Sequence, residues 1–229
     1  MEVLDTILEN ASEPLYTVTL FVALMRYQNY YSSPLKYFPV LLAYTLLTEL
    51  LGFLTMNYDE FQISIFTSIV SHNVFIYNIY NLVFFNYFFY VYWCYLKDKK
   101  SKSFILYGAI FFLIISIINL FFQNFKFESQ VYSYITGAIL ILFCTVLFLW
   151  EYFRSSKKLD YKDKGMKWIS IGLFIFHLGY GPIKISRYYN YLNQLNELVH
   201  VRRIHLTLII LMYICFIIGF LKMKRKFWI

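Results

Sequence analysis

The chain has 229 residues, of which 60% are hydrophobic and only 15% are charged. A soluble domain of this size is roughly 45–50% apolar, so this composition excludes a soluble globular protein and indicates that much of the surface faces lipid. The net charge of +8 comes from short basic segments between apolar runs, a pattern that favours membrane orientation over nucleic-acid binding.

Seven apolar segments follow one another along the chain. We expect an all-α fold in which they form a single transmembrane bundle domain over residues 1–229. The first segment is short: it reaches both interfaces only with the help of Tyr16, Arg26 and Tyr27, and a helix lying on the membrane surface is the alternative. The expected spans are 15–25, 37–54, 74–96, 103–122, 132–153, 166–183 and 205–221.

The three cysteines, Cys94, Cys144 and Cys215, fall inside apolar segments and lack the spacing of metal ligands. We therefore expect no disulfide, no metal site and no cofactor. The first 13 residues are acidic and have no basic n-region, so no cleavable signal peptide is expected.

Basic residues are distributed unevenly between the two ends of the expected bundle. Sixteen of the 21 Lys and Arg residues lie in the connections 26–36, 97–102 and 154–167 or after residue 221, and five lie on the opposite side. Because cytoplasmic connections carry the excess of positive charge, this pattern predicts a cytoplasmic C-terminus and an external N-terminus.

The second segment carries a polar and small face. Thr45, Thr48, Glu49 and Gly52 are spaced i, i+3, i+4 and i+7, so they share one side of a helix that must face the bundle interior. Glu49 is the only acidic residue deep in an expected span. It is a candidate proton site, cation site or catalytic acid, and the alternative is a hydrogen-bonded packing residue.

The third segment carries Asn78, Asn81 and Asn86. An Asn side chain in lipid needs partners on other helices, so we expect this helix to occupy a central position. We expect Glu49 to lie beside it, within hydrogen-bonding reach of Asn78 or Asn81. The asparagines may be read as interhelical contacts without any further role.

The fifth and sixth segments contain small residues at helical spacing that favour close helix approach. They are Ser133 and Gly137 in one, and Gly165, Gly172 and Gly179 in the other. His177 shares a face with Ser170 and precedes an expected helix break at 179–182. It is a candidate proton carrier or ligand, and a structural hydrogen-bonded histidine is the alternative.

The outer connection after residue 183 is unusually basic for its side. Two interpretations remain open: an external vestibule that attracts an anionic ligand, or contact with lipid phosphates. The candidate residues are Lys184, Arg187, Arg202 and Arg203, with Tyr188, Tyr189 and Tyr191 nearby.

Three further stretches of the sequence are informative: LMRYQNYYSSPLKYFPVLLAYTLLTELLGFL (24–54), NIYNLVFF (78–85) and KFWI (226–229). With them the chain resembles a group of small seven-helix bacterial integral membrane proteins. The resemblance implies seven spans and the bacterial inner (plasma) membrane, and it assigns no activity to any residue.

The sequence shows no nucleophile paired with a base, no phosphate-binding loop and no soluble catalytic domain. We therefore expect a sensor, receptor-like or effector module in signalling, acting through a protein partner or as a homo-oligomer, with no nucleic acid bound. The alternatives are a small-solute or ion transporter or channel that uses Glu49, and an intramembrane lipid-modifying enzyme that uses Glu49 and His177.

Overall fold

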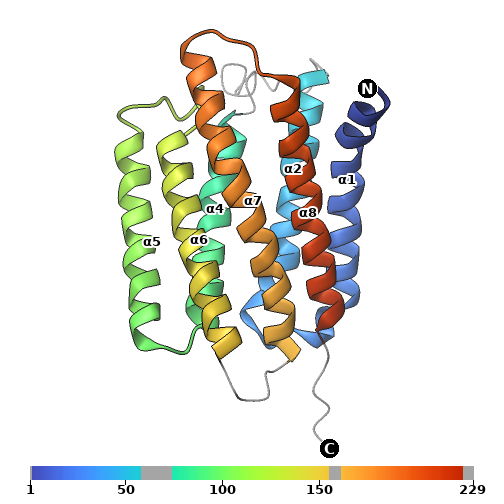
Figure 1. Ribbon diagram of the computed structural model, residues 1–229, viewed down its shortest axis with the longest axis vertical. Helices are drawn as coiled ribbons and strands as arrows, with labels where there is room; N and C mark the ends of the chain where they lie inside the picture. The colour runs from blue at the N-terminus through green and yellow to red at the C-terminus, as the bar shows by residue number, and fades with distance from the viewer. Residues whose placement is uncertain (1, 58–73, 155–160, 224–229) are drawn as a thin grey trace, which may run out of the picture.

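The computed structural model describes residues 2–57, 74–154 and 161–223, and every regular element in these ranges is helical. The long helices of the described chain run side by side in one bundle (Figure 1). They are α1 (Glu2–Met25), α2 (Phe38–Asn57), α4 (Val74–Tyr95), α5 (Lys99–Asn119), α6 (Val131–Arg154), α7 (Tyr161–Leu192) and α8 (Val199–Lys222), with the short 3-10 helices η1 (Tyr27–Asn29) and η2 (Pro34–Tyr37) between α1 and α2.

Six stretches of this bundle are long and apolar enough to cross a membrane: η2 with α2, and α4 to α8. The expected all-helical membrane fold is thus confirmed, and the protein has the character of an integral membrane protein in contact with lipid. Helix α1 is not among the six, since its first half carries Asp5, Glu9 and Glu13.

The helices close into a ring. Contacts link α1 to α2, α2 to α4, α4 to α5, and then α5, α6, α7 and α8 in sequence, and α8 returns to α1. Helix α4 also contacts α6 across the ring, which gives it neighbours on several flanks. In Figure 1 the upper end of the bundle holds the connections 120–130 and 193–198, and the lower end holds the connection 26–37 and the end of α8.

Glycines bring α7 and α8 into close contact, as the heptad spacing predicted. A Cβ added at Gly172 would lie 2.9 Å from both the Met212 carbonyl oxygen and the Cys215 Cβ, and one added at Gly165 would lie 2.9 Å from the Gly219 carbonyl oxygen. Only glycine allows the two backbones to approach this closely.

Aromatic rings fill the lower half of the bundle interior. The Phe38 ring lies 5.2–5.5 Å, between centroids, from the rings of Phe88, Phe216 and Phe220. All four side chains are almost fully buried. One turn after Phe88 along α4, the Tyr92 hydroxyl donates a 3.0 Å hydrogen bond to the Ser170 hydroxyl of α7. This layer joins α2, α4 and α8 through contacts between buried rings.

Polar groups stabilise the lower end where the helices leave the apolar region. Asp98 caps α5, because its carboxylate accepts hydrogen bonds from the Ser101 amide at 2.9 Å and the Ser101 hydroxyl at 3.0 Å. These bonds hold the pKa of the Asp98 carboxyl below its ordinary value. The Glu151 carboxylate accepts from the backbone amide of Lys97, which ties α6 to the turn between α4 and α5.

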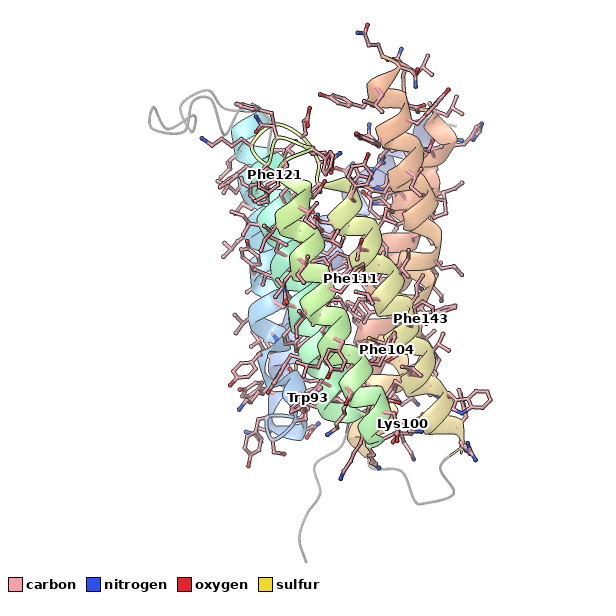
Figure 2. All side chains as sticks on the ribbon, turned by 90° about the vertical axis from the view of Figure 1, so that its left-hand side faces the viewer. Trp93, Lys100, Phe104, Phe111, Phe121 and Phe143 are labelled. Atoms are coloured by element: carbon pink, nitrogen blue, oxygen red, sulfur yellow. The ribbon has the colours of Figure 1, made fainter. Side chains whose placement is uncertain are left out.

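The outer face of the bundle is apolar over most of its height. Figure 2 shows Phe104 and Phe111 projecting outward from α5, with Lys100 at the lower end. Phe121, beyond the upper end of α5, is 85% exposed. Such a face is expected of a helix in contact with lipid acyl chains.

The expected break at 179–182 is wrong. Helix α7 continues through Gly181 and Pro182 to Leu192. Proline removes one backbone donor, but in an apolar environment a complete break would leave several more groups without partners. The continuation carries Lys184 and Arg187 on the helix itself rather than on a loop.

We predict that Gly172→Ala destabilises the bundle, because the new Cβ would meet α8 backbone atoms 2.9 Å away. The expected cost is about 1–3 kcal/mol, seen as a lower midpoint of thermal unfolding in detergent. Gly181→Ala in the same helix is the matched control. A Cβ there meets nothing within 4 Å, so its midpoint should stay or rise, and equal losses in both variants would contradict the packing argument.

Candidate functional site

The upper half of the bundle encloses a polar chamber of about 480 Å³. Its lining comes from α1, α2, α4, α6, α7 and α8, together with Ser129 of the connection 120–130. The volume falls in the range of about 300–1,000 Å³ that is usual for small-molecule sites. The chamber lies above the aromatic layer of the lower half.

One side of the chamber is acidic and rich in tyrosine. The Tyr77 hydroxyl of α4 donates a 2.9 Å hydrogen bond to Oε2 of Glu49 on α2. The Glu49 charge also acts on the hydroxyls of Tyr16, Tyr80 and Tyr213. No basic side chain of the described chain forms an ion pair with Glu49. We call this set the acidic pole: Tyr16, Thr45, Glu49, Tyr77, Tyr80 and Tyr213.

The acidic pole is held by contacts among its own members. The Thr45 hydroxyl bonds the Leu41 carbonyl oxygen at 2.9 Å and lies 3.1 Å from the Tyr80 hydroxyl. The rings of Tyr16 and Tyr213 lie 4.6 Å apart between centroids, which joins α1 to α8 at this side. Four helices thus converge around one carboxylate.

The other side of the chamber is basic. Arg187 of α7 donates to the Glu197 carboxylate at 2.7 Å, to the Tyr180 hydroxyl at 3.3 Å and to Nδ1 of His205 at 3.3 Å. The Lys184 ammonium lies 5.4 Å from the centre of the Tyr134 ring. We call Tyr134, Tyr180, Lys184, Arg187 and His205 the basic pole.

Within the described residues Lys184 has no carboxylate partner, since the ion pair at this pole joins Arg187 and Glu197. The charge of Arg187 is thereby compensated, whereas that of Lys184 is not. A cation that lines a chamber without a counter-charge is suited to bind an anionic group.

His177 lies between the two poles and is only 2% exposed. Its Nδ1 is hydrogen-bonded to the Tyr134 hydroxyl at 3.2 Å, and its Nε2 has no partner in the described protein. Asn81 also lines the chamber without a hydrogen bond to any described residue. A buried polar atom such as Nε2 of His177 normally has a partner, whereas the partly exposed Asn81 amide faces a space that water or a ligand can enter.

Most of the residues predicted as sites come together in this chamber: Thr45, Glu49, Asn78, Asn81, His177, Lys184 and Arg187 all line it. Thr48 is buried but bonds the Tyr44 carbonyl oxygen away from the lining. Arg202 and Arg203 do not line the chamber either. They lie in α8, with Arg202 exposed at the upper end.

The expected bond between Glu49 and Asn78 or Asn81 is wrong. Glu49 faces the interior beside α4, but its hydrogen bond comes from Tyr77. The Asn78 amide nitrogen donates to the carbonyl oxygens of Phe125 and Glu128, both at 2.9 Å, and its oxygen accepts from the Gln130 amide at 3.2 Å. Asn78 therefore fixes the connection 120–130 onto α4.

Sequence reasoning missed the tyrosines and His205. Tyr77, Tyr80, Asn81 and Phe84 follow helical spacing, so the face that carries Asn81 also carries two phenolic hydroxyls. Counting tyrosine as a polar residue would have identified this face of α4 as part of the site. Residue 205 was expected only as the start of the last span, 205–221.

The arrangement favours binding over covalent chemistry. Within residues 2–57, 74–154 and 161–223 no three His, Cys, Asp or Glu side chains are placed to hold a metal ion. The chamber instead offers a carboxylate, an ammonium, two imidazoles and several phenols around a partly apolar space.

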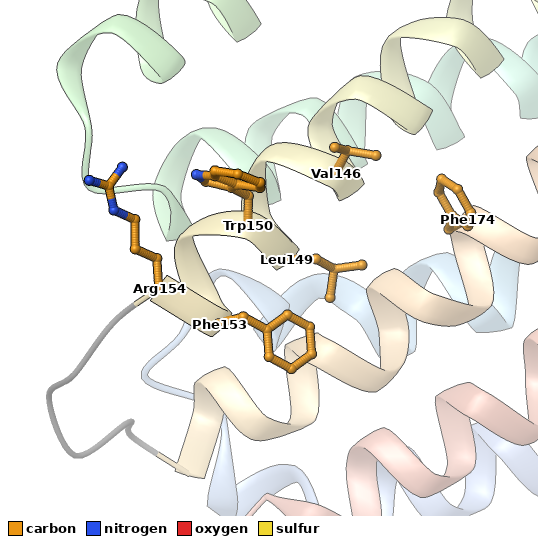
Figure 3. Close-up of a pocket in the computed structure, with 6 residues that line it drawn as sticks. All are labelled: Val146, Leu149, Trp150, Phe153, Arg154 and Phe174. Atoms are coloured by element: carbon orange, nitrogen blue, oxygen red, sulfur yellow. The ribbon is translucent and has the colours of Figure 1, made fainter.

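A second hollow lies on the outside of the bundle between α6 and α7 at the lower end (Figure 3). It is lined by Val146, Leu149, Trp150, Phe153, Arg154 and Phe174. Trp150 and Phe153 are largely exposed, and the only charged group is Arg154 at the membrane edge. This hollow has the character of a lipid contact, with an acyl chain along the rings and a headgroup near the guanidinium.

Comparison with known proteins identifies no relative: no family model, no curated protein and no solved structure matches the chain. The resemblance to small seven-helix bacterial membrane proteins therefore stays a prediction.

We predict that Asn78→Leu destabilises the protein by about 2–4 kcal/mol, because it leaves the buried groups of the connection 120–130 without their partners. The matched control is Asn86→Leu, since the Asn86 amide bonds only the Leu82 carbonyl oxygen of its own helix. Thermal unfolding in detergent measures both. A loss at Asn86 as large as at Asn78 would contradict the assigned role.

Proposed function

We propose that the protein is a receptor-like membrane module that binds a small polar molecule in the chamber and acts through a protein partner or a second copy of itself. One observation carries the proposal: Lys184, with no counter-ion among the described residues, lines the 480 Å³ chamber together with His177, whose Nε2 has no partner in the described protein. An anionic group of a bound ligand would pair with Lys184.

The aromatic layer below the chamber favours a receptor over a channel. Phe38, Phe88 and Phe216 are each no more than 1% exposed, so packed aromatic rings fill the interior directly below the chamber. A conducting pore needs a continuous polar or hydrated lining. A chamber that ends on packed rings is suited to detecting a ligand from one side.

Transport remains the second candidate, because Glu49 lines the chamber as an intramembrane carboxyl group. In that case the present arrangement is one of two, and the aromatic layer separates to release the solute. Solute flux into liposomes distinguishes the two functions. Turnover of lipid extracts tests the lipid-enzyme alternative, for which Glu49 and His177 line one cavity.

We propose that the upper end faces outward, with the N-terminus outside and the C-terminus in the cytoplasm of a bacterium. Most basic residues of the described chain belong to the lower end, among them Lys97, Lys99 and Lys100. This arrangement agrees with the positive-inside rule and opens the chamber's end to extracellular solutes.

We propose further that α1 is a seventh span. It has 24 residues, about 36 Å at 1.5 Å per residue, and it runs beside α8. Its inner face is buried through Tyr16, Thr19 and Ala23, and the Tyr30 hydroxyl bonds the Ala23 carbonyl oxygen at 2.7 Å. The acidic residues of its first half would then lie at the outer surface.

Cysteine labelling of cells tests the orientation. In a Cys94→Ser background, a membrane-impermeant maleimide should label Lys126→Cys in intact cells and Lys100→Cys only after permeabilisation. Both positions are exposed at opposite ends of the bundle. The reverse pattern would overturn the orientation. Residue 59, the position that the sequence alone suggested for this test, lies outside the described residues.

Accessibility of the chamber tests the receptor proposal itself. In the same background, Asn81→Cys should react with a small maleimide added from outside, because the side chain lines the chamber. Thr145→Cys, fully buried in α6, is the control and should react at least about tenfold more slowly. Equal protection of both sites would exclude a chamber reached from outside.

A further inference from the structure

The two poles of the chamber carry opposite charges that do not neutralise each other. Glu49 is bonded to a tyrosine and Lys184 lies over a tyrosine ring, and no ion pair joins them. Charges that serve only stability in a low-dielectric interior are normally paired directly, because an isolated one is costly. A bound molecule that carries both an ammonium and an anionic group would supply a counter-charge to Glu49 and to Lys184.

The acidic pole has the composition of an ammonium site. Tyr16, Tyr77, Tyr80 and Tyr213 line the chamber together with Glu49, the Tyr77 hydroxyl donates to the Glu49 carboxylate, and the Tyr16 and Tyr213 rings are in contact. Aromatic faces attract cations, and the attraction is strongest where the cation is desolvated. A carboxylate with phenolic neighbours therefore suits a protonated amine better than a neutral group.

The basic pole has the composition of an anion site. Lys184 supplies an uncompensated ammonium, and the nearby Arg187 keeps its ion pair with Glu197. His177 adds a ring nitrogen whose partner is missing in the described protein. A carboxylate or phosphate placed here would accept charge-assisted hydrogen bonds, which are about twice as strong as neutral ones.

Part of the chamber wall is apolar. Phe84 of α4, Phe176 of α7, and Ile209 and Met212 of α8 form this part of the wall. A ligand that bridges the poles would therefore place an uncharged, partly apolar body here.

We propose that the chamber binds a zwitterion, a small molecule with an ammonium group at the acidic pole and a carboxylate or phosphate at the basic pole. This inference rests on the proposed function, since it names the ligand class of the same chamber. A free amino acid and a phosphoethanolamine headgroup share this chemistry, and the experiment separates them.

Binding of matched probes to the purified full-length protein in detergent tests the proposal. The probes are 4-aminobutanoate, its two halves butanoate and butylamine, and phosphoethanolamine, each followed by isothermal calorimetry. The zwitterion should bind at least about tenfold more tightly than either half, which corresponds to about 1.4 kcal/mol. Tighter binding of 4-aminobutanoate indicates a free amino acid, and tighter binding of phosphoethanolamine indicates a lipid headgroup.

Two substitutions test which charged group of the ligand binds at each pole. Glu49→Gln should weaken binding of 4-aminobutanoate about tenfold and leave butanoate unchanged, whereas Lys184→Gln should weaken it equally and leave butylamine unchanged. Retained binding of the half-probe shows that each variant is folded. Lys126→Gln, an exposed charge change at the same end that does not line the chamber, should have no effect.

Two results would overturn the proposal. If butanoate binds as tightly as 4-aminobutanoate and only Lys184→Gln weakens it, the chamber takes a simple anion, and the receptor proposal survives. If none of the four probes binds, the zwitterion is wrong, and the labelling of Asn81→Cys then decides separately whether the chamber is reached from outside.

Discussion

Inside a bilayer no water is available to satisfy polar groups, so each one has to find a partner within the bundle, and this requirement determines much of the structure. Asn78 meets it with three hydrogen bonds to the connection 120–130. Tyr92 meets it through Ser170, and Thr19 through the Leu15 carbonyl oxygen one turn earlier. Because Asn78 ties α4 to the connection ahead of α6, it also fixes the rotation of α4. Its neighbours Tyr77, just before it, and Asn81, one turn later, are then presented to the chamber.

In the chamber, several polar groups lack the hydrogen-bond partners that the membrane interior requires. Lys184, Asn81 and Nε2 of His177 all border one cavity, and none has a full set of partners within the described residues. A partly satisfied polar network is less stable than an apolar core of the same shape. The lower half of the same bundle shows that this chain can build such a core, with Phe38, Phe88 and Phe216 in contact. The polar lining therefore reflects a use for the groups rather than a packing need, and binding is the use that their chemistry supports.

The sequence was sufficient for the features that depend on composition and spacing. Long apolar segments predicted six of the helices to within a few residues at most ends, and the glycines at 165 and 172 predicted the close approach of α7 and α8. The sequence-based prediction failed where a rule for helix ends in water was applied to a helix in the membrane. Pro182 and Gly181 read as a break, yet α7 continues because its backbone bonds have no substitute in lipid. The sequence identified most residues of the site but not which of them bond to each other. Which hydroxyl reaches Glu49 depends on the rotation of α4 about its axis. That rotation is set by the connection bonded to Asn78, and the helical spacing of residues does not encode it.

Tyrosine contributes both to the packed core of the lower half and to the polar lining of the chamber in the upper half. Phenylalanine and tyrosine pack alike, so the ring contacts that hold the helices together continue from the lower half into the upper one. What changes is the hydroxyl. In the lower half the hydroxyls of Tyr30 and Tyr92 bond groups of the protein itself. In the upper half the Tyr77 hydroxyl reaches a carboxylate that has no cation among the described residues, and the Tyr134 hydroxyl reaches a histidine whose second nitrogen has no partner in the same part of the chain. Exchange between the two residue types at chamber positions would alter the polarity of the lining and keep the shape of the wall, so the ligand preference of such a bundle can diverge while its fold is maintained.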